Sequence, residues 1–301
     1  MTELALGTVA FGVDYGITNT AGAPSDDVIL SILDLAHEAG VTLFDTAADY
    51  GTAQQRLGEL TTAQTQLTHT TGTQRRFVTK FSLPTDGSRA SSDNLYRQSM
   101  AQLRVAHLEG VLFHKLSDLA DDRTAEAVEI LREGRQAGLL SRIGVSVYNE
   151  IDLAHALEVM PDLSLVQIPA NVFDRRLLDS ALLTELVRNG VHVHVRSAFL
   201  QGLVFANPNE LPDFFSPLAP ALTAVRDEAT ARGVSVQSVA LSALKFHPNV
   251  SAVVVGAQSA SEMEEIVRAW RDATELPLLS FDAIPEPVLD PRQWPSTKVK
   301  S

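Results

Sequence analysis

Short runs of hydrophobic residues alternate along the chain with longer amphipathic stretches. A short hydrophobic run that is bounded by polar or turn residues is typical of a buried strand. Eight such runs predict strands at residues 4–9, 41–44, 77–80, 110–113, 142–145, 165–168, 191–195 and 252–255.

Most of the intervals between these runs carry hydrophobic residues at helical spacing. After Ser25, a suitable N-cap, hydrophobic residues recur three and four positions apart until Gly40, which is typical of a helix end. Residues 124–136 and 222–231 show a similar pattern. Residues 205–220 and 285–301 lack it, so we expect a long surface loop and an irregular C-terminal tail.

Strands that alternate with helices imply right-handed βαβ units and a parallel sheet. Eight such units close most naturally into a (β/α)8 barrel of the TIM type. A doubly wound open sheet is the alternative, and periodicity alone does not exclude it. Because 301 residues suit one barrel, we expect a single α/β domain with parallel strands over residues 1–301.

Composition narrows the classes of function. The chain has 24 Lys and Arg against 37 Asp and Glu, a formal net charge of −13, which disfavours nucleic acid and anionic membrane surfaces as partners. It has no cysteine, which excludes disulfides and zinc–sulfur sites. The first residues resemble no secretion signal, and the hydrophobic runs are too short to span a bilayer. We expect a cytoplasmic protein without a metal, while the oligomeric state stays open.

Polar residues follow three successive predicted strands, at the end where a barrel places its active site. Asp45 and Tyr50 follow the second strand, Lys80 ends the third, and His114 follows the fourth. Singly, such residues are more often structural than functional. Together they fit one chemistry, because an ammonium makes a nearby tyrosine hydroxyl more acidic and a carboxylate holds that ammonium in a pocket of low dielectric constant. His114 would orient the substrate oxygen.

These residues resemble the catalytic tetrad of the aldo-keto reductase superfamily. The motifs are Asp45-Thr46-Ala47 with Tyr50-Gly51, Val78-Thr79-Lys80, and His114. Further matches, in the family's order and spacing, are Leu6-Gly7-Thr8, Gly144-Val145-Ser146, Gln167 with Asn171, Ser197, Gln201-Gly202-Leu203, and Gly256-Ala257 with Ser259 and Glu265. Each match is weak by itself, whereas their common order makes the resemblance specific.

The resemblance implies an oxidoreductase that interconverts a carbonyl and an alcohol by hydride transfer to or from a nicotinamide cofactor. It makes Tyr50 the general acid in reduction and the general base in oxidation. It makes Lys80, paired with Asp45, the group that tunes the acidity of Tyr50. It makes His114 the group that polarises the carbonyl. The residues implied for cofactor binding are Gly7, Thr8, Ser146, Gln167, Arg196, Ser197, Gln201, Gly202, Gly256, Gln258, Ser259, Glu262 and Glu265.

The expected cofactor is NADP(H), with NAD(H) as the alternative. The segment after Gly256 opens a helix, and the free N–H groups of a helix N-terminus suit a phosphate. Residues 256–266 contain three Glu and no Lys or Arg that could hold the adenosine 2′-phosphate. We therefore expect binding of NADP(H) with weaker discrimination against NAD(H) than the most selective members of the family show.

The chain departs from the family pattern at Val147 and Ile266, where Asn is common, and at Arg196, where an aromatic residue usually stacks on the nicotinamide. The charge of Arg196 bears on substrate type and on the redox balance of the cofactor.

Phe11, Tyr15 and Phe199 are the candidate residues of the substrate pocket, although Phe11 could equally be a packing residue. Aromatic residues beside His114 and Arg196 suit a polar oxygenated substrate such as a sugar, and the partner we expect is a small carbonyl or alcohol compound.

Two other functions stay open at this point. A Schiff-base lyase on the same barrel would use Lys80 as its nucleophile, which Asp45 disfavours by holding the lysine protonated. A regulatory barrel that binds the cofactor with little turnover, like the channel beta subunits of the superfamily, is compatible with an intact tetrad. Borohydride trapping of an adduct tests the first, and turnover of a generic aldehyde tests the second.

Overall fold

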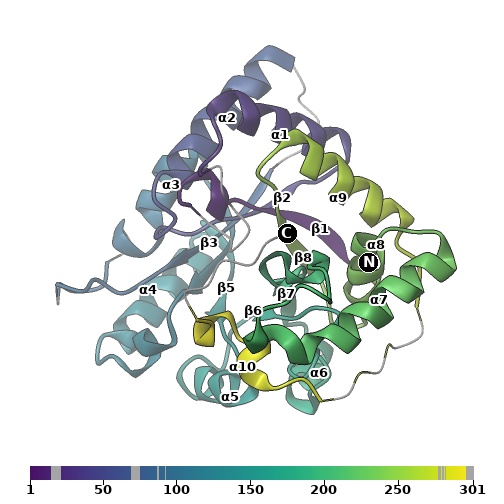
Figure 1. Ribbon diagram of the computed structural model, residues 1–301. Coiled ribbons are helices and arrows are strands. Elements are labelled where there is room, and N and C mark those ends of the chain that lie inside the picture. The colour runs from purple at the N-terminus through teal and green to yellow at the C-terminus, as the bar shows by residue number, and fades with distance from the viewer. Residues whose placement is uncertain are drawn as a thin grey trace.

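Eight parallel strands form a closed barrel in the computed structural model, in the order in which they follow one another along the chain (Figure 1). The structure describes residues 1–14, 22–68, 75–86, 88–91, 93–276, 279, 281 and 283–295. The strands are β1 (Glu3–Gly7), β2 (Leu43–Asp45), β3 (Arg76–Phe81), β4 (Leu108–Phe113), β5 (Leu140–Ser146), β6 (Leu165–Pro169), β7 (His192–Arg196) and β8 (Ala252–Gly256). Pairing of β1 with β8 closes the barrel, which confirms the predicted (β/α)8 fold and excludes the open sheet.

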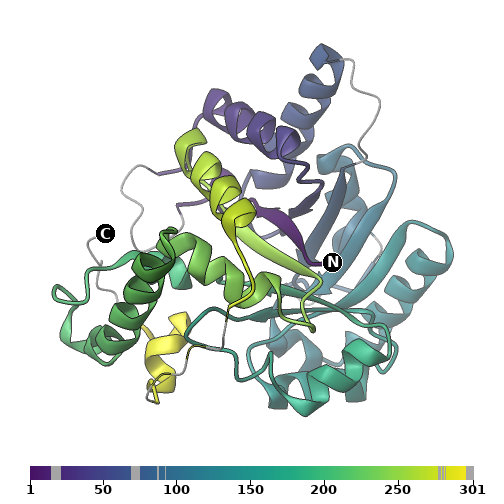
Figure 2. The same ribbon diagram turned by 90° about the vertical axis from the view of Figure 1, so that its right-hand side faces the viewer.

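Helices surround this barrel and cover the outward faces of its strands (Figure 1). They are α1 (Asp26–Glu38), α2 (Ala53–Thr68), α3 (Gln98–Leu103), α4 (Thr124–Gln136), α5 (Glu150–Val159), α6 (Ala181–Arg188), α7 (Ala219–Arg232), α8 (Val236–Lys245), α9 (Ala260–Asp272) and α10 (Glu286–Leu289). Helices α1 and α9, far apart in sequence, run side by side because β1 and β8 are neighbours (Figure 2).

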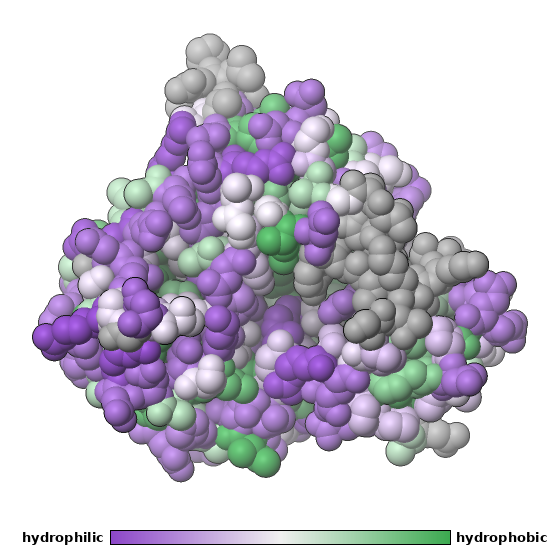
Figure 3. Space-filling view, turned by 60° about the vertical axis from the view of Figure 1, so that its left-hand side comes forward, coloured by the Kyte–Doolittle hydropathy of each residue, from purple (hydrophilic) through white to green (hydrophobic). Residues whose placement is uncertain are grey.

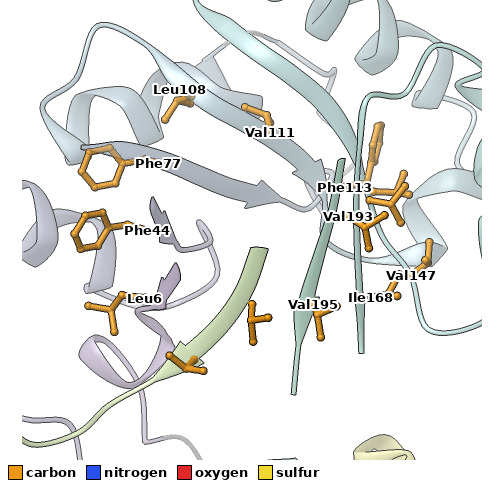
Figure 4. Packing of buried hydrophobic residues seen from close by; sticks show 14 of the residues in the cluster. Leu6, Phe44, Phe77, Leu108, Val111, Phe113, Val147, Ile168, Val193 and Val195 are labelled. Carbon is orange, nitrogen blue, oxygen red and sulfur yellow. The ribbon is translucent and has the colours of Figure 1, made fainter. Parts of the chain in front are cut away.

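Hydrophobic side chains form one layer inside the barrel and another between the strands and the helices. The two layers arise because successive residues of a strand point to opposite faces. On β2, for example, Leu43 belongs to the inner cluster and Phe44 to the outer one. Figure 4 shows the outer layer, in which Phe44 and Phe77 stack with ring centroids 5.4 Å apart. These packed layers leave the carboxyl ends of the strands as the place for polar groups.

The first helix and the first loop show how local hydrogen bonds set the element boundaries. Ser25 caps α1 as predicted, and its hydroxyl accepts a hydrogen bond from the Val28 N–H. The first strand is shorter than the predicted 4–9. Thr8 donates from both its backbone N–H and its hydroxyl to the Asp45 carbonyl, at 2.9 and 3.0 Å, and the chain then turns into the 3-10 helix η1 (Val9–Phe11).

The C-terminal tail, expected to be irregular over 285–301, is ordered into short helices in its described part. Helix α10 is followed by the 3-10 helix η6 (Pro291–Gln293). The tail folds because Val288 and Leu289 are buried in a hydrophobic cluster with Phe215, and Trp294 packs edge-on against Phe215. A helix of one turn is too short to be recognised by periodicity.

The stretch 205–220, expected to be an irregular loop, contains the 3-10 helix η5 (Asp213–Leu218) and the start of α7.

The surface drawn in Figure 3 is mostly hydrophilic, with hydrophobic residues scattered over it rather than gathered in one large patch. Within the described ranges, no helix has both the length and the apolar character needed to span a bilayer.

Candidate active site

A cavity of about 980 Å³ opens at the carboxyl ends of the strands, where a barrel of this type carries its active site. All four residues of the predicted tetrad line it: Asp45, Tyr50, Lys80 and His114. The residues predicted to bind the cofactor also line it, with the exception of Ser259: Gly7, Thr8, Ser146, Gln167, Arg196, Ser197, Gln201, Gly202, Gly256, Gln258, Glu262 and Glu265. One cavity therefore gathers residues that the sequence spreads over most of its length.

Lys80 and Asp45 form a buried ion pair at the floor of this cavity. Lys80 Nζ lies 2.6 Å from Asp45 Oδ1 and also donates to the Thr46 carbonyl at 2.9 Å, and the two side chains are 1% and 6% exposed. Burial alone lowers the pKa of Lys80, but the attraction of Asp45 and Tyr50 outweighs it, so this pKa lies above the ordinary lysine value. Lys80 therefore stays protonated.

Tyr50 lies in the turn between β2 and α2, directly beside this ion pair. Lys80 Nζ is 5.1 Å from the centre of the Tyr50 ring, and the His114 ring meets the Tyr50 ring edge-on at 5.6 Å. The hydroxyl-bearing ring thus has a fixed positive charge and an imidazole as neighbours. This geometry suits a phenol that gives and receives a proton.

His114 is positioned by Asp49, a residue to which the sequence reasoning gave no role. His114 Nδ1 lies 3.4 Å from Asp49 Oδ2, and the same oxygen accepts a 2.6 Å hydrogen bond from the Ser82 hydroxyl. Burial and the charge of Lys80 lower the pKa of His114, and Asp49 only partly opposes them. His114 is therefore neutral at pH 7. The sequence signal for Asp49 is its place between Ala47 and Tyr50, inside the segment that carries two of the tetrad candidates.

Gln167 links the cofactor residues to the tetrad. Its Nε2 donates a 2.6 Å hydrogen bond to Asp45 Oδ2, while its Oε1 is buried without a hydrogen-bond partner among the described residues. A buried carbonyl oxygen without a donor is costly unless a ligand supplies one. The Oε1 atom therefore fits the N–H of an amide, such as the carboxamide of a nicotinamide cofactor.

Two backbone segments on the other side of the cavity suit phosphate groups. Ser197, Leu200, Gln201 and Gly202 all have positive φ, between 47° and 94°, and a turn of this kind can hold an anion with its backbone N–H groups. The N–H groups of Leu200 and Gly202 already donate to the carbonyls of Ser197 and Phe199, each at 2.9 Å. The second segment is the N-terminus of α9.

At α9, Ser259 is the N-cap and accepts from the Glu262 N–H. Glu262 Oε2 accepts a 2.8 Å hydrogen bond from the Gln258 N–H. A carboxylate therefore already stands at this helix end, where the helix dipole would otherwise favour a phosphate.

Arg196 and two residues missed by the sequence reasoning form a stack at the rim of the cavity. The Arg196 Cζ atom lies 4.2 Å, and the Arg292 Cζ atom 3.6 Å, from the centre of the Tyr148 ring. Arg292 also pairs with Asp290 at 2.7 Å. Arg292 belongs to the C-terminal tail, where no sequence motif pointed to a role in the site.

The three candidates for the substrate pocket have different outcomes. Phe199 lines the cavity. Phe11 does not line it, because this last residue of η1 is fully buried in the outer hydrophobic layer, and it is a packing residue. Tyr15 lies outside the described residues.

Comparison with known proteins identifies relatives over nearly the whole chain. A model of the aldo/keto reductase family matches residues 3–285. The chain is 27% identical to L-galactose dehydrogenase of Arabidopsis thaliana, over 98% of this chain and 95% of that protein. It is 26% identical to 6-dehydroglucose reductase of Novosphingobium aromaticivorans, over 89% and 88%.

Solved structures show the same fold at low sequence identity. A Bacillus halodurans aldo-keto reductase in its holo form superposes with a TM-score of 0.68 at 19% identity, over 91% of this chain and 88% of that one. A thermostable aldo-keto reductase bound to the inhibitor epalrestat superposes with a TM-score of 0.67 at 22% identity, over 92% of each chain. Since the family model spans nearly the whole chain, the protein belongs to the aldo/keto reductase family and is an NAD(P)-dependent oxidoreductase.

Proposed function

We propose that Tyr50 is the proton donor when this protein reduces a carbonyl and the proton acceptor when it oxidises the alcohol. The observation that carries the proposal is the buried Lys80–Asp45 ion pair beside the Tyr50 ring. A fixed positive charge stabilises the phenolate that Tyr50 becomes once it has given its proton away. Asp45 keeps that charge in place, because an unpaired ammonium is costly to bury.

His114 would orient the oxygen of the substrate. Its pKa is lowered by burial and by Lys80, so the ring is neutral near pH 7 and keeps a single N–H. A neutral imidazole can hydrogen-bond the reacting oxygen without competing with Tyr50 as the acid. Tyr50 would act as the acid and His114 as the orienting group because the two side chains have different surroundings.

The cofactor would bind along the cavity from Gln167 to α9, and when bound it supplies or accepts the hydride. Gln167 and Ser146 would hold the carboxamide, and the positive-φ turn at Ser197 would lie along the phosphates. We propose NADP(H), with weaker discrimination against NAD(H) than the most selective members of the family show, because the α9 end offers Gln258 and two glutamates but no Lys or Arg to a 2′-phosphate.

The substrate class that we propose is a sugar or a related polyhydroxy carbonyl compound. Two relatives are named for hexose substrates, L-galactose and 6-dehydroglucose. The cavity wall supports this class, because His114, Tyr148 and Arg292 offer hydrogen-bonding groups at its rim while Phe199 provides an apolar surface. Hydrogen bonds to several hydroxyl groups orient such a substrate for one reaction at one carbon.

A Schiff-base lyase fits the site poorly. Nucleophilic lysines need a lowered pKa, whereas the pKa of Lys80 is raised by Asp45 and Tyr50 despite burial. Borohydride should therefore trap no covalent adduct between a carbonyl compound and the protein.

The function is tested by measuring turnover of D- and L-galactose, glucose, and simple aldehydes and ketones, with NADP(H) and NAD(H) in both directions. We expect Tyr50-dependent turnover of at least one sugar, with a higher kcat/KM than for an unsubstituted aliphatic aldehyde. Tight cofactor binding without turnover of any carbonyl or alcohol would favour the regulatory barrel instead.

A further inference from the structure

Within the described ranges, one positive charge in the cavity has no carboxylate beside it. Four Lys and Arg side chains line the cavity. Three of them are compensated at N···O distances of 2.6, 3.7 and 2.7 Å, namely Lys80 by Asp45, Lys115 by Asp49 and Arg292 by Asp290. Arg196 alone among the four has no ion-pair partner in the part of the chain that the structure describes.

The contacts of Arg196 leave its charge uncompensated. Its Nε and one terminal nitrogen make only long contacts, 3.4 Å to the Ser146 hydroxyl and 3.5 Å to the Val147 carbonyl. Its guanidinium carbon stacks 4.2 Å above the centre of the Tyr148 ring. Hydroxyl, carbonyl and aromatic groups hold a guanidinium in place, but they bring no net negative charge.

The position of Arg196 places this charge close to the groups that would hold the nicotinamide. Arg196 ends β7, which pairs with β6 so that Arg196 lies opposite Pro169, two residues after Gln167. It also contacts Ser146, at the end of β5. Gln167 in turn is bonded to Asp45 of the tetrad. A ring that exchanges hydride with a substrate held by Tyr50 and His114 must therefore occupy the same cavity as this guanidinium.

We propose that Arg196 makes the protein bind the reduced cofactor more tightly than the oxidised one. The proposal rests on the proposed function. The oxidised nicotinamide ring carries a positive charge and the reduced ring is neutral, so a guanidinium in the same cavity repels only the oxidised form. At the effective dielectric constant of about 20 typical near a protein surface, unit charges a few ångströms apart repel strongly enough to change a dissociation constant by about tenfold or more.

This preference acts on the direction of the reaction. In oxidation, the alcohol carbon transfers a hydride to the oxidised ring and the hydroxyl transfers its proton to the Tyr50 phenolate, which yields the carbonyl and the reduced cofactor. Because Arg196 destabilises only the oxidised form, it shifts the equilibrium between the bound species toward the carbonyl and the reduced cofactor. Arg196 thus favours alcohol oxidation on the protein, at the expense of slower release of the reduced cofactor.

The test is direct titration of NADP⁺ and NADPH by calorimetry, without substrate, for wild type, Arg196→Gln, Arg196→Lys and Arg188→Gln. Arg188→Gln makes the same change in net charge at the last residue of α6, which is exposed. This end of α6 precedes the start of β7 and therefore lies at the end of the barrel opposite to the cavity. We expect the ratio of dissociation constants, oxidised over reduced, to fall about tenfold in Arg196→Gln and to stay near the wild-type value in Arg196→Lys and Arg188→Gln.

Three results would overturn the proposal. The first is an unchanged ratio in Arg196→Gln. The second is equal weakening of both forms, which would assign Arg196 to the phosphates that both forms share. The third is an equally large fall of the ratio of dissociation constants in Arg196→Lys, which would assign the effect to stacking rather than charge. A wild type that binds neither form would instead refute the proposed function.

Discussion

Gln167 donates a 2.6 Å hydrogen bond to Asp45, and this contact joins the residues predicted to bind the cofactor to the ion pair beneath Tyr50. The second oxygen of Asp45 accepts from Lys80 at 2.6 Å. Both carboxylate oxygens are thus occupied, which fixes the plane of the carboxylate and with it the position of the ammonium. The side chain that would contact the nicotinamide therefore also orients the group that tunes the acid.

The first prediction concerns this contact. Gln167→Ala should lower kcat about tenfold and weaken cofactor binding, because a hydrogen bond to a charged group is worth roughly 1.5–3 kcal/mol. Gln167→Glu should have a larger effect, since it places a second carboxylate beside Asp45 and favours protonation of one of them. The measurements are the pH–rate profile and the cofactor dissociation constant. If both variants keep the wild-type kcat, the contact does not position the tetrad.

The second prediction concerns the buried ion pair. Asp45→Asn should destabilise the protein by about 3–5 kcal/mol, because it leaves the Lys80 charge buried with no carboxylate against it. The double variant Asp45→Asn with Lys80→Met removes both charges and should be more stable than Asp45→Asn alone. Urea unfolding of the wild type, both single variants and the double variant measures the coupling. Additive effects would show that the pair contributes no interaction energy.

The same two substitutions should also change activity, and here Lys80→Met should have the larger effect. Lys80→Met removes the charge beside Tyr50 and should abolish turnover or move the activity profile to higher pH. Asp45→Asn keeps the ammonium but holds it less well, so its effect should be milder. Identical pH–rate profiles for wild type and both variants would contradict the coupling between the ion pair and the acid.

The third prediction concerns His194, which points into the barrel and is almost fully buried. Burial lowers its pKa to about 4, and its Nδ1 has no hydrogen-bond partner among the described residues. A folded-state pKa below the unfolded value of about 6.5 means that the unfolded chain takes up the proton first. The free energy of unfolding should therefore fall as the pH drops from about 6.5 to about 4, with a contribution of about 3 kcal/mol from this residue.

Urea unfolding of wild type and His194→Gln at pH 7.5, 5.5 and 4.5 checks this. The stability difference between the two proteins should shift in favour of the variant as the pH falls, because glutamine takes up no proton. His155→Gln is the matched control, since the His155 side chain is 47% exposed on the surface of α5. A difference between wild type and His194→Gln that is independent of pH would contradict the prediction.

The fourth prediction concerns cofactor preference. Glu262→Gln removes a negative charge at the N-terminus of α9 and keeps an oxygen that can accept from the Gln258 N–H. NADPH affinity should increase several-fold while NADH affinity changes little, because only NADPH carries a 2′-phosphate that the carboxylate repels. Dissociation constants for both cofactors measure this. Glu264→Gln, on the same helix but outside the cavity lining, should change neither constant.

The dissociation constants of the wild type for NADPH and NADH also test whether α9 determines the cofactor preference. A preference for NADPH above about a thousandfold would mean that a basic residue reaches the 2′-phosphate and that α9 is not the determinant. Equal gains for both cofactors in Glu262→Gln would place this side chain near the shared part of the molecule instead.

The gathering of the four tetrad candidates in one cavity was predictable because strand ends are visible in the sequence. Asp45, Lys80 and His114 each end or follow a hydrophobic run, and parallel strands bring their carboxyl ends to one edge. Nothing comparable marks Tyr148 and Arg292, whose contact depends on how a loop after β5 and the C-terminal tail fold over the same rim. Such contacts are set by tertiary packing and leave no periodic pattern.

Phe11 shows the opposite case, in which a residue near a strand end was a candidate for the pocket, with packing as the alternative, and lies in the core. The chain turns into η1 directly after Thr8, so the alternation of inward and outward residues that holds within β1 no longer applies at Phe11. Its exposed fraction is 0%, and it packs against the outer hydrophobic layer. Side-chain direction in a short 3-10 turn is decided by packing rather than by local spacing.

The most direct test of the central claim is single-turnover hydride transfer by wild type and Tyr50→Phe, with cofactor binding measured in parallel. If Tyr50 is the acid and base, the rate should fall by about 10²–10⁴-fold, while the cofactor dissociation constant changes little because the variant lacks only one hydroxyl. A Tyr50→Phe protein that transfers hydride at a rate near that of the wild type would contradict the assignment of Tyr50 and with it the proposed role of the Lys80–Asp45 pair.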